Sequence, residues 1–271
     1  MPLPFTDQAD ADLDACVEMM RGGSKTFFAA SRFLPTRVRS ASIALYAFCR
    51  VADDMVDQGG VIEDSLRVLH HRLDLMYAGT PMDTVEDRAL CIVVHRHALP
   101  RHLLDALLDG FAWDGHGRQY ETMEDLHGYA ARVAGSVGAM MCWIMGPQQA
   151  STLARACELG VAMQLTNIAR DVGEDARNKR IYLPLQWMRE EGLEPATWMA
   201  HPECNTAVQR VISRVLEEAD RLYKRSMAGI AELPRDCRSA ILAAGLIYGE
   251  IGNQLRSLGL DSVNHRAVVS G

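Results

Sequence analysis

Two groups of acidic residues carry the clearest chemical signal in the sequence. The stretch 159–184 holds Gln164, Asn167, Asp171 and Asp175 at intervals of three, four and four residues. These intervals keep the four side chains on one stripe of an α-helix, because successive residues turn by about 100°. Apolar residues flank the stripe on both sides, so we expect it to face an interior cavity.

The second acidic group lies in YAFCRVADDMVD and contains Asp53, Asp54 and Asp57, just before Gly59-Gly60. The negative end of a helix disfavours anions by about 0.3–1 kcal/mol each. Like charges four residues apart cost about 0.2–0.5 kcal/mol more. Mg²⁺ offsets both costs, since it prefers oxygen ligands and joins one or two carboxylates to substrate phosphates. Either group alone could be a solvated helix face, but two together favour a metal site for a phosphorylated ligand.

Arginines accompany both acidic groups. Arg50 lies three residues before Asp53, and Arg170 precedes Asp171. A cation beside a metal site can hold the negative charge that develops on a departing diphosphate. Tyrosines are more often core residues, but near a cavity they could donate to phosphate or shield a carbocation. The small residues of VAGSVGAMM (133–141) allow either close helix packing or room for a long apolar ligand.

Composition and missing motifs exclude several functions. The 271 residues have a net charge of −7 without a basic block, so nucleic-acid binding is not expected. The seven scattered cysteines predict reduced thiols in a cytoplasmic compartment. No dinucleotide-binding, P-loop, zinc or GxSxG pattern occurs. The longest uncharged run is interrupted at Gly146-Pro147 and predicts a buried helix rather than a membrane span, while peripheral membrane contact stays open.

Helical periodicity covers almost the whole chain, and no segment alternates as a strand would. We therefore predict an all-α protein of about ten or more helices in one domain. The expected helices span 8–21, 24–33, 36–57, 62–77, 84–97, 101–112, 121–145, 148–175, 185–191, 204–229 and 235–260, with loops at 113–120 and 176–184.

These motifs together resemble the squalene/phytoene synthase family of head-to-head prenyl synthases. The similar segments are SKTFFAASRFLP (24–35), LYAFCRVADDMVD (45–57), YAARVAGSVGAMM (129–141), LGVAMQLTNIARDVGEDARNKRIYLP (159–184), and IYGEIG with HRAVV within 247–269. The resemblance implies an isoprenoid-synthase fold, a single bundle over residues 1–271 around a central cavity. It also implies that the two acidic groups face each other across the cavity mouth.

The resemblance assigns roles by position. It implies Mg²⁺, with Mn²⁺ as an alternative, held by Asp53, Asp57, Asn167, Asp171 and Asp175. It implies diphosphate contacts from Arg50, Arg170, Tyr248 and Arg266, with Tyr248 and the four aspartates as catalytic residues. It implies a cavity lined by Ser24, Thr26, Phe27, Tyr46, Tyr129, Val133, Ala134, Gly138 and Gln164.

The implied reaction joins two molecules of geranylgeranyl diphosphate through prephytoene diphosphate to phytoene, the first committed step of carotenoid biosynthesis. Diphosphate leaves at both steps, and no nicotinamide cofactor is expected. Two departures from the family pattern are minor. Ala130-Ala131-Arg132 stands where relatives often carry aromatic or polar residues, and the short basic tail that relatives often carry is expected to be absent after Gly271.

Three alternatives remain. A squalene, presqualene-diphosphate or dehydrosqualene synthase would use farnesyl diphosphate, and cavity depth would distinguish it. A non-catalytic helical scaffold would have lost acidic residues, whereas both groups are intact. A helical redox metal protein is disfavoured, because Glu124-x-x-His127 has no second copy.

Overall fold

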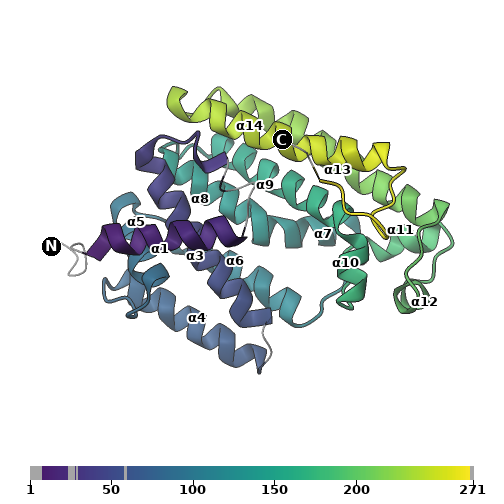
Figure 1. Cartoon of the computed structure of the whole chain (residues 1–271), viewed down its shortest axis with the longest axis horizontal. Coiled ribbons are helices and arrows are strands. Elements are labelled where there is room, and N and C mark those ends of the chain that lie inside the picture. Colours follow the sequence, from purple (N-terminus) through teal and green to yellow (C-terminus); the bar gives the residue numbers. More distant parts are fainter. Residues whose placement is uncertain (1–7, 24–27, 29, 58–59, 269–271) are drawn as a thin grey trace.

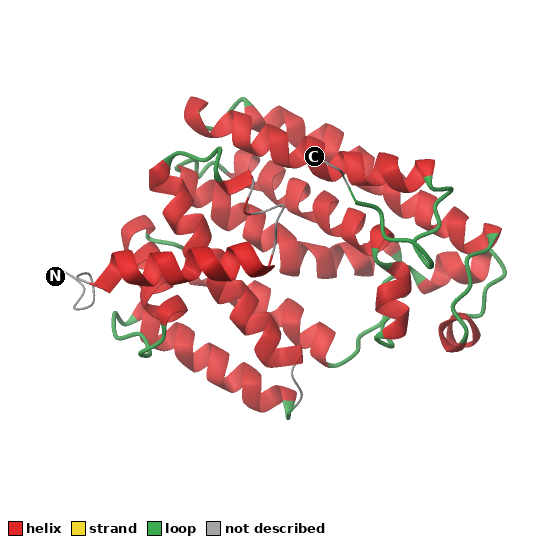
Figure 2. Cartoon of the chain, viewed as in Figure 1, coloured by secondary structure: helices red, strands yellow, loops and turns green. Residues whose placement is uncertain are grey.

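The computed structural model describes residues 8–23, 28, 30–57 and 60–268, and every regular element within them is a helix (Figure 2). The predicted all-α class is confirmed. The elements are α1 (Ala9–Gly23), α3 (Thr36–Asp57), α4 (Ile62–Tyr77), α5 (Val85–His97), α6 (Arg101–Gly115), α7 (Met123–Ala130), the π-helix η2 (Ala131–Gly135), α8 (Ser136–Met145), α9 (Ala150–Arg170), α10 (Val172–Arg177), α11 (Leu185–Glu190), α12 (Pro195–Ala200), α13 (Thr206–Ile230) and α14 (Arg235–Ser257).

Helix α9 runs through the middle of the bundle and packs against η2, α8, α13 and α14 (Figure 1). One cluster of buried side chains joins α3, α5, α6 and α8, and a second joins α9, α13 and the segment 181–183. The helices α8 and α9 approach closely at Gly138, where a Cβ atom would lie 2.3 Å from the carbonyl oxygen of Ala156. At Gly138, the small-residue segment 133–141 thus serves close helix packing.

The helix expected over 121–145 is not uniform. A capping box between Thr122 and Asp125 begins α7, and the π-helical turn Ala131–Gly135 then separates α7 from α8. π-Helical turns are rare overall, and those that occur are often found at functional sites. Here the turn brings the side chains of Val133 and Ala134 to the wall of a cavity.

The prediction of one unbroken helix over 148–175 is wrong. Helix α9 ends at Arg170, and α10 begins at Val172 after Asp171, whose φ and ψ are −104° and 13°. The backbone N–H of Gly173 donates to the carbonyl of Ser262 at 3.0 Å. A contact with the C-terminal segment therefore replaces the helical hydrogen bond that an unbroken helix would make there.

Two other boundaries differ from the prediction. Helix α6 continues to Gly115, so Trp113 and Asp114 are helical and not part of a loop. The short helix α12 falls where no helix was expected. Across the described residues, none of the helices offers a stretch apolar and long enough to traverse a bilayer.

Candidate active site

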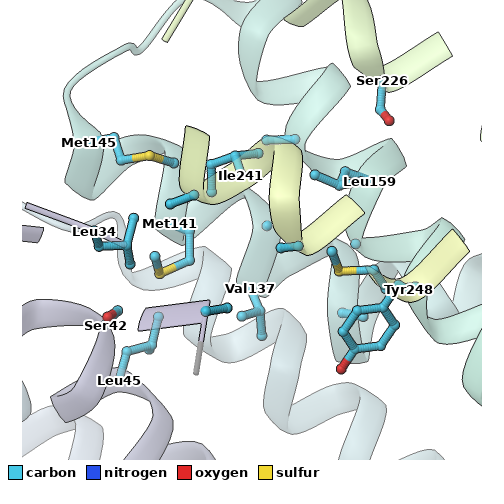
Figure 3. Close-up of a pocket in the computed structure, with 18 of the residues that line it drawn as sticks. Leu34, Ser42, Leu45, Val137, Met141, Met145, Leu159, Ser226, Ile241 and Tyr248 are labelled. Carbon is cyan, nitrogen blue, oxygen red and sulfur yellow. The ribbon is translucent and has the colours of Figure 1, made fainter. Parts of the chain in front are cut away.

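A largely apolar cavity of about 320 Å³ lies between α3, η2, α8, α9, α13 and α14. Figure 3 shows Val137 and Met141 of α8, Leu45 of α3 and Ile241 of α14 around it. Tyr248 lies on one side of the cavity, and Leu34 and Met145 lie on the opposite side. A space of this kind suits an extended hydrocarbon, because few polar groups would have to be desolvated.

Several of the residues expected in the cavity wall lie there. The lining includes Tyr46, Val133, Ala134, Gly138 and Gln164, together with Asn167 and Tyr248. Ser24, Thr26 and Phe27 fall outside the described residues. Tyr129 is not among the lining residues, because its side chain packs on Tyr120 and Tyr182.

The first acidic group ends helix α3. Arg50 pairs with Asp54 at 2.7 Å and lies 3.9 Å from Asp53. Burial and the neighbouring Asp57 raise the pKa of Asp53 to about 6, against the opposing effect of Arg50. Asp57 accepts a hydrogen bond from Arg180 at 2.7 Å. The first acidic group therefore holds excess negative charge that a cation could neutralise.

The second acidic group spans the break between α9 and α10. Asp171 accepts hydrogen bonds from Arg170 at 2.8 and 2.5 Å and from Arg266 at 2.9 Å. Burial opposes ionisation of Asp171, but the two arginines outweigh it and lower the pKa. Burial, followed by Asp171 and Glu174, raises the pKa of Asp175 to about 7. The two carboxylates of one motif thus differ in how readily they give up a proton.

Two further charged residues lie between the acidic groups. Asp114 of α6 accepts hydrogen bonds from the hydroxyls of Tyr129 at 2.5 Å and Tyr182 at 2.7 Å. Arg180 follows α10 and reaches Asp57 of the first group. Asp114 was not predicted from the sequence, because it lies on a third helix and no spacing pattern relates it to either group. Arg180 carried a weak signal as a cation in the charged loop 176–184.

The residues fit a divalent cation that is shared with a substrate. The Oδ1 atom of Asn167 is buried and has no hydrogen-bond partner among the described residues, which leaves an oxygen at the cavity wall able to ligate. Within the part of the chain that the structure describes, no three His, Cys, Asp or Glu side chains gather closely enough to hold an ion by themselves. Mg²⁺ commonly takes one or two carboxylates and completes its shell with water and phosphate oxygens.

Comparisons with known proteins agree with this architecture. The profile of the squalene/phytoene synthase family matches residues 20–271. A phytoene synthase of Rhodobacter capsulatus is 50% identical over 262 residues, covering 96% of this chain and 77% of its own. One of Cereibacter sphaeroides is 52% identical over 269 residues, covering 96% and 76%.

Solved structures give the same result. The crystal structure of a dehydrosqualene synthase superposes with a TM-score of 0.86 at 33% identity, covering 94% of this chain and 89% of its own. A squalene synthase of Alicyclobacillus acidocaldarius shares the fold, with a TM-score of 0.86 at 24% identity over 93% of this chain and 96% of its own. The resemblance inferred from the motifs is thereby confirmed. The chain belongs to the squalene/phytoene synthase family.

Proposed function

We propose that this prenyltransferase condenses two geranylgeranyl diphosphates head to head into phytoene, through prephytoene diphosphate. The observation that carries the proposal is the apolar cavity whose wall includes Asn167 and Tyr248. The carbonyl of Asn167 accepts the backbone N–H of Asp171, and Tyr248 lies within electrostatic reach of Asp171. The high identity to two phytoene synthases supports geranylgeranyl over farnesyl diphosphate as the substrate.

The polar groups at the cavity mouth would bind the diphosphates. Arg170 and Arg266 both lie on Asp171, and Arg50 lies on Asp54. These guanidinium groups can exchange carboxylate oxygens for diphosphate oxygens, because their paired N–H donors bind both kinds of oxygen equally well. Asp53, Asp57, Asn167, Asp171 and Asp175 would hold Mg²⁺, or Mn²⁺ in its place. When bound, the metal would supply positive charge that helps diphosphate to leave.

The first half of the reaction makes a cyclopropane. The bond between C1 and oxygen of one substrate breaks, and its electron pair leaves with diphosphate. The double bond of the second substrate attacks the allylic cation, and loss of a proton closes the ring. The apolar wall, including Leu45 and Val137, excludes water that would otherwise capture the cation.

The second half repeats the ionisation. The remaining diphosphate leaves the cyclopropyl intermediate, the carbon skeleton rearranges, and a final proton is lost to give phytoene. No hydride is required, so the proposal includes no nicotinamide cofactor. Tyr46 and Tyr248 border the cavity, where their rings can face a cationic intermediate.

A product assay tests the proposal. The purified protein is incubated with Mg²⁺ and either geranylgeranyl or farnesyl diphosphate, without a reductant, and the extracted hydrocarbons are analysed. We expect a C40 hydrocarbon from the first substrate and none after addition of EDTA. A C30 product from farnesyl diphosphate alone would assign the sibling reaction, and no product from either would favour a non-catalytic scaffold.

Substitution of the aspartates tests the metal assignment. We expect Asp53→Ala and Asp171→Ala to lose at least about a thousandfold in kcat while the far-UV circular dichroism stays unchanged. Asp74→Ala is the matched control, because Asp74 is an exposed carboxylate that pairs with Arg101 and belongs to neither acidic group. Activity near that of the wild type in either Asp53→Ala or Asp171→Ala would refute the assignment.

The proposal also includes peripheral contact of this protein with a membrane through the outer face of α14. The α14 residues Leu242 and Leu246 are 41% and 60% exposed, whereas Ile241 and Ala244 of the same helix line the cavity. A bilayer against the outer face of α14 would receive a hydrocarbon that water cannot dissolve. Sedimentation with phosphatidylcholine vesicles tests this, and binding that is unchanged in Leu242→Ser/Leu246→Ser would contradict it.

A further inference from the structure

Three parts of the chain that are distant in sequence meet at the carboxylate of Asp114. Its Oδ2 atom accepts the hydroxyl of Tyr129 from α7 at 2.5 Å. Its Oδ1 atom accepts the hydroxyl of Tyr182, from the segment after α10, at 2.7 Å. Burial chiefly, together with Asp114, raises the pKa of both tyrosines. The phenols therefore keep their protons, and Asp114 is the acceptor in both hydrogen bonds.

The two tyrosines form a stacked cluster with a third. The ring centroids of Tyr129 and Tyr182 are 5.3 Å apart, and that of Tyr120 lies 5.1 Å from Tyr129 and 6.1 Å from Tyr182. The carbonyl of Tyr120 also accepts a hydrogen bond from the backbone N–H of Leu185. Asp114 thus fixes Tyr129 and Tyr182 relative to α6, and the Tyr120 ring packs against both.

The segment anchored by Tyr182 also carries Arg180 to the first acidic group. The backbone N–H of Arg180 donates to the carbonyl of Asp175 at 2.8 Å, and its guanidinium donates to Asp57 at 2.7 Å. Asp114 adds to the effects that raise the pKa of Asp53 and of Asp175. It therefore lies within electrostatic reach of both acidic groups.

A carboxylate that only held the two tyrosines in place would be unfavourable at this position, because it repels the neighbouring carboxylates. A neutral acceptor could join two hydroxyls without adding to the repulsion among the neighbouring carboxylates. A carboxylate acceptor gains in return shorter and stronger hydrogen bonds than a neutral one. The arrangement therefore favours accurate placement of the two tyrosines, at the cost of added repulsion among the neighbouring carboxylates.

We propose that Asp114 is a positioning residue of the coupling reaction, which fixes Tyr129 and the Arg180 segment relative to both acidic groups by accepting the hydroxyls of Tyr129 and Tyr182. The proposal rests on the proposed function. It assigns Asp114 no contact with the substrate, so its removal should slow the chemistry more than it weakens substrate binding.

The test compares Asp114→Asn with Asp109→Asn, a control that removes an exposed carboxylate from the same helix. For Asp114→Asn we expect kcat to fall by at least about tenfold and KM for geranylgeranyl diphosphate to change by less than about threefold. We also expect more of the flux to be released as the cyclopropyl diphosphate intermediate. The fraction of intermediate released and the KM do not depend on the amount of folded enzyme. A loss of stability alone would therefore change neither quantity.

A double-mutant cycle with Tyr182→Phe tests the contact itself. We expect Tyr182→Phe to lower kcat by about fivefold in the wild-type background and by less than about twofold in Asp114→Ala, because alanine leaves no side-chain oxygen to accept the Tyr182 hydroxyl. Additive effects, or an Asp114→Asn enzyme with the kcat and product ratio of Asp109→Asn, would overturn the proposal for Asp114. An inactive wild type would instead refute the proposed function, and with it any role of Asp114 in that reaction.

Discussion

Arg180 Nη2 lies 2.7 Å from Asp57 Oδ1, and this ion pair joins the segment after the second acidic group to the end of the helix that carries the first. Both side chains keep roughly a third or more of their surface exposed. Exposed pairs contribute only about 0–1 kcal/mol to stability. The pair is therefore better understood as placing a cation beside the first acidic group than as holding the fold together.

Replacement of Arg180 by glutamine should separate these two roles. We expect Arg180→Gln to change the free energy of unfolding by less than about 1 kcal/mol. We expect kcat/KM to fall by at least about tenfold, because a cation facing Asp57 is lost. Arg189→Gln is the matched control, since Arg189 pairs with Glu121 on the surface. Equal kcat/KM values for the two variants would contradict the interpretation.

The pH dependence of metal binding follows from the two raised carboxylate pKa values. Without metal, Asp53 and Asp175 keep their protons up to about pH 6 and about pH 7. Mg²⁺ must displace those protons, so the Mg²⁺ concentration for half-maximal activity should rise as the pH is lowered from 8 to 6. A constant value over this range, at saturating substrate, would show that neither carboxylate binds the metal.

The same shifts predict a trend in the stability of the metal-free protein. Because the folded-state pKa values lie above the usual 3.8, the two groups favour the folded state at low pH. That contribution is lost as the pH rises through about 6 and 7. Relative to the wild type, Asp53→Asn/Asp175→Asn should therefore gain stability between pH 4.5 and 7.5 in urea unfolding. A stability difference that does not change with pH would contradict the assignment.

Gly173 should be intolerant of a side chain. A Cβ atom there would lie 2.0 Å from the carbonyl oxygen of Val263, in the segment that carries Arg266 to Asp171. We expect Gly173→Ala to cost about 1–3 kcal/mol in unfolding free energy and to lower kcat/KM, because Arg266 is displaced. Gly249→Ala is the control, since within the described part of the chain nothing beyond its chain neighbours and the local helix backbone lies within 4 Å of that Cβ position.

Arg266→Gln completes this comparison. It should lower kcat/KM without the loss of stability, since Arg266 is an exposed residue. If Arg266→Gln keeps wild-type kcat/KM, the C-terminal segment does not serve the reaction through this arginine, and Gly173 matters for stability alone.

Bulk in the cavity should change the choice of substrate. Val137 lines the apolar wall, so Val137→Phe shortens the room for a prenyl chain. We expect kcat/KM for geranylgeranyl diphosphate to fall by at least about tenfold relative to farnesyl diphosphate, which is one isoprene unit shorter. Val68→Phe adds the same bulk at a position that is 43% exposed, and it should leave the ratio unchanged. An unchanged ratio in Val137→Phe would mean that the chain does not occupy this part of the cavity.

Local sequence determined the class of the fold and most of the helix bounds. The predicted helices 36–57 and 62–77 have the observed bounds. Hydrophobic periodicity and the glycines and prolines that end helices act over only a few residues, so the local sequence is sufficient to set these bounds. The residue types also determined the kind of chemistry, since two acidic groups with adjacent arginines already predict a cation and diphosphate site.

Tertiary structure decided how those residues come together. The helix is interrupted at Asp171, where the backbone N–H of Gly173 donates to the carbonyl of Ser262. This hydrogen bond joins segments far apart in sequence, so no local periodicity predicts it. Asp114 joins the site for the same reason, since only the packing of α6 against Tyr129 and Tyr182 brings it between the acidic groups. Helical period is a property of neighbours along the chain, whereas the meeting of charges from three segments depends on how the completed bundle packs.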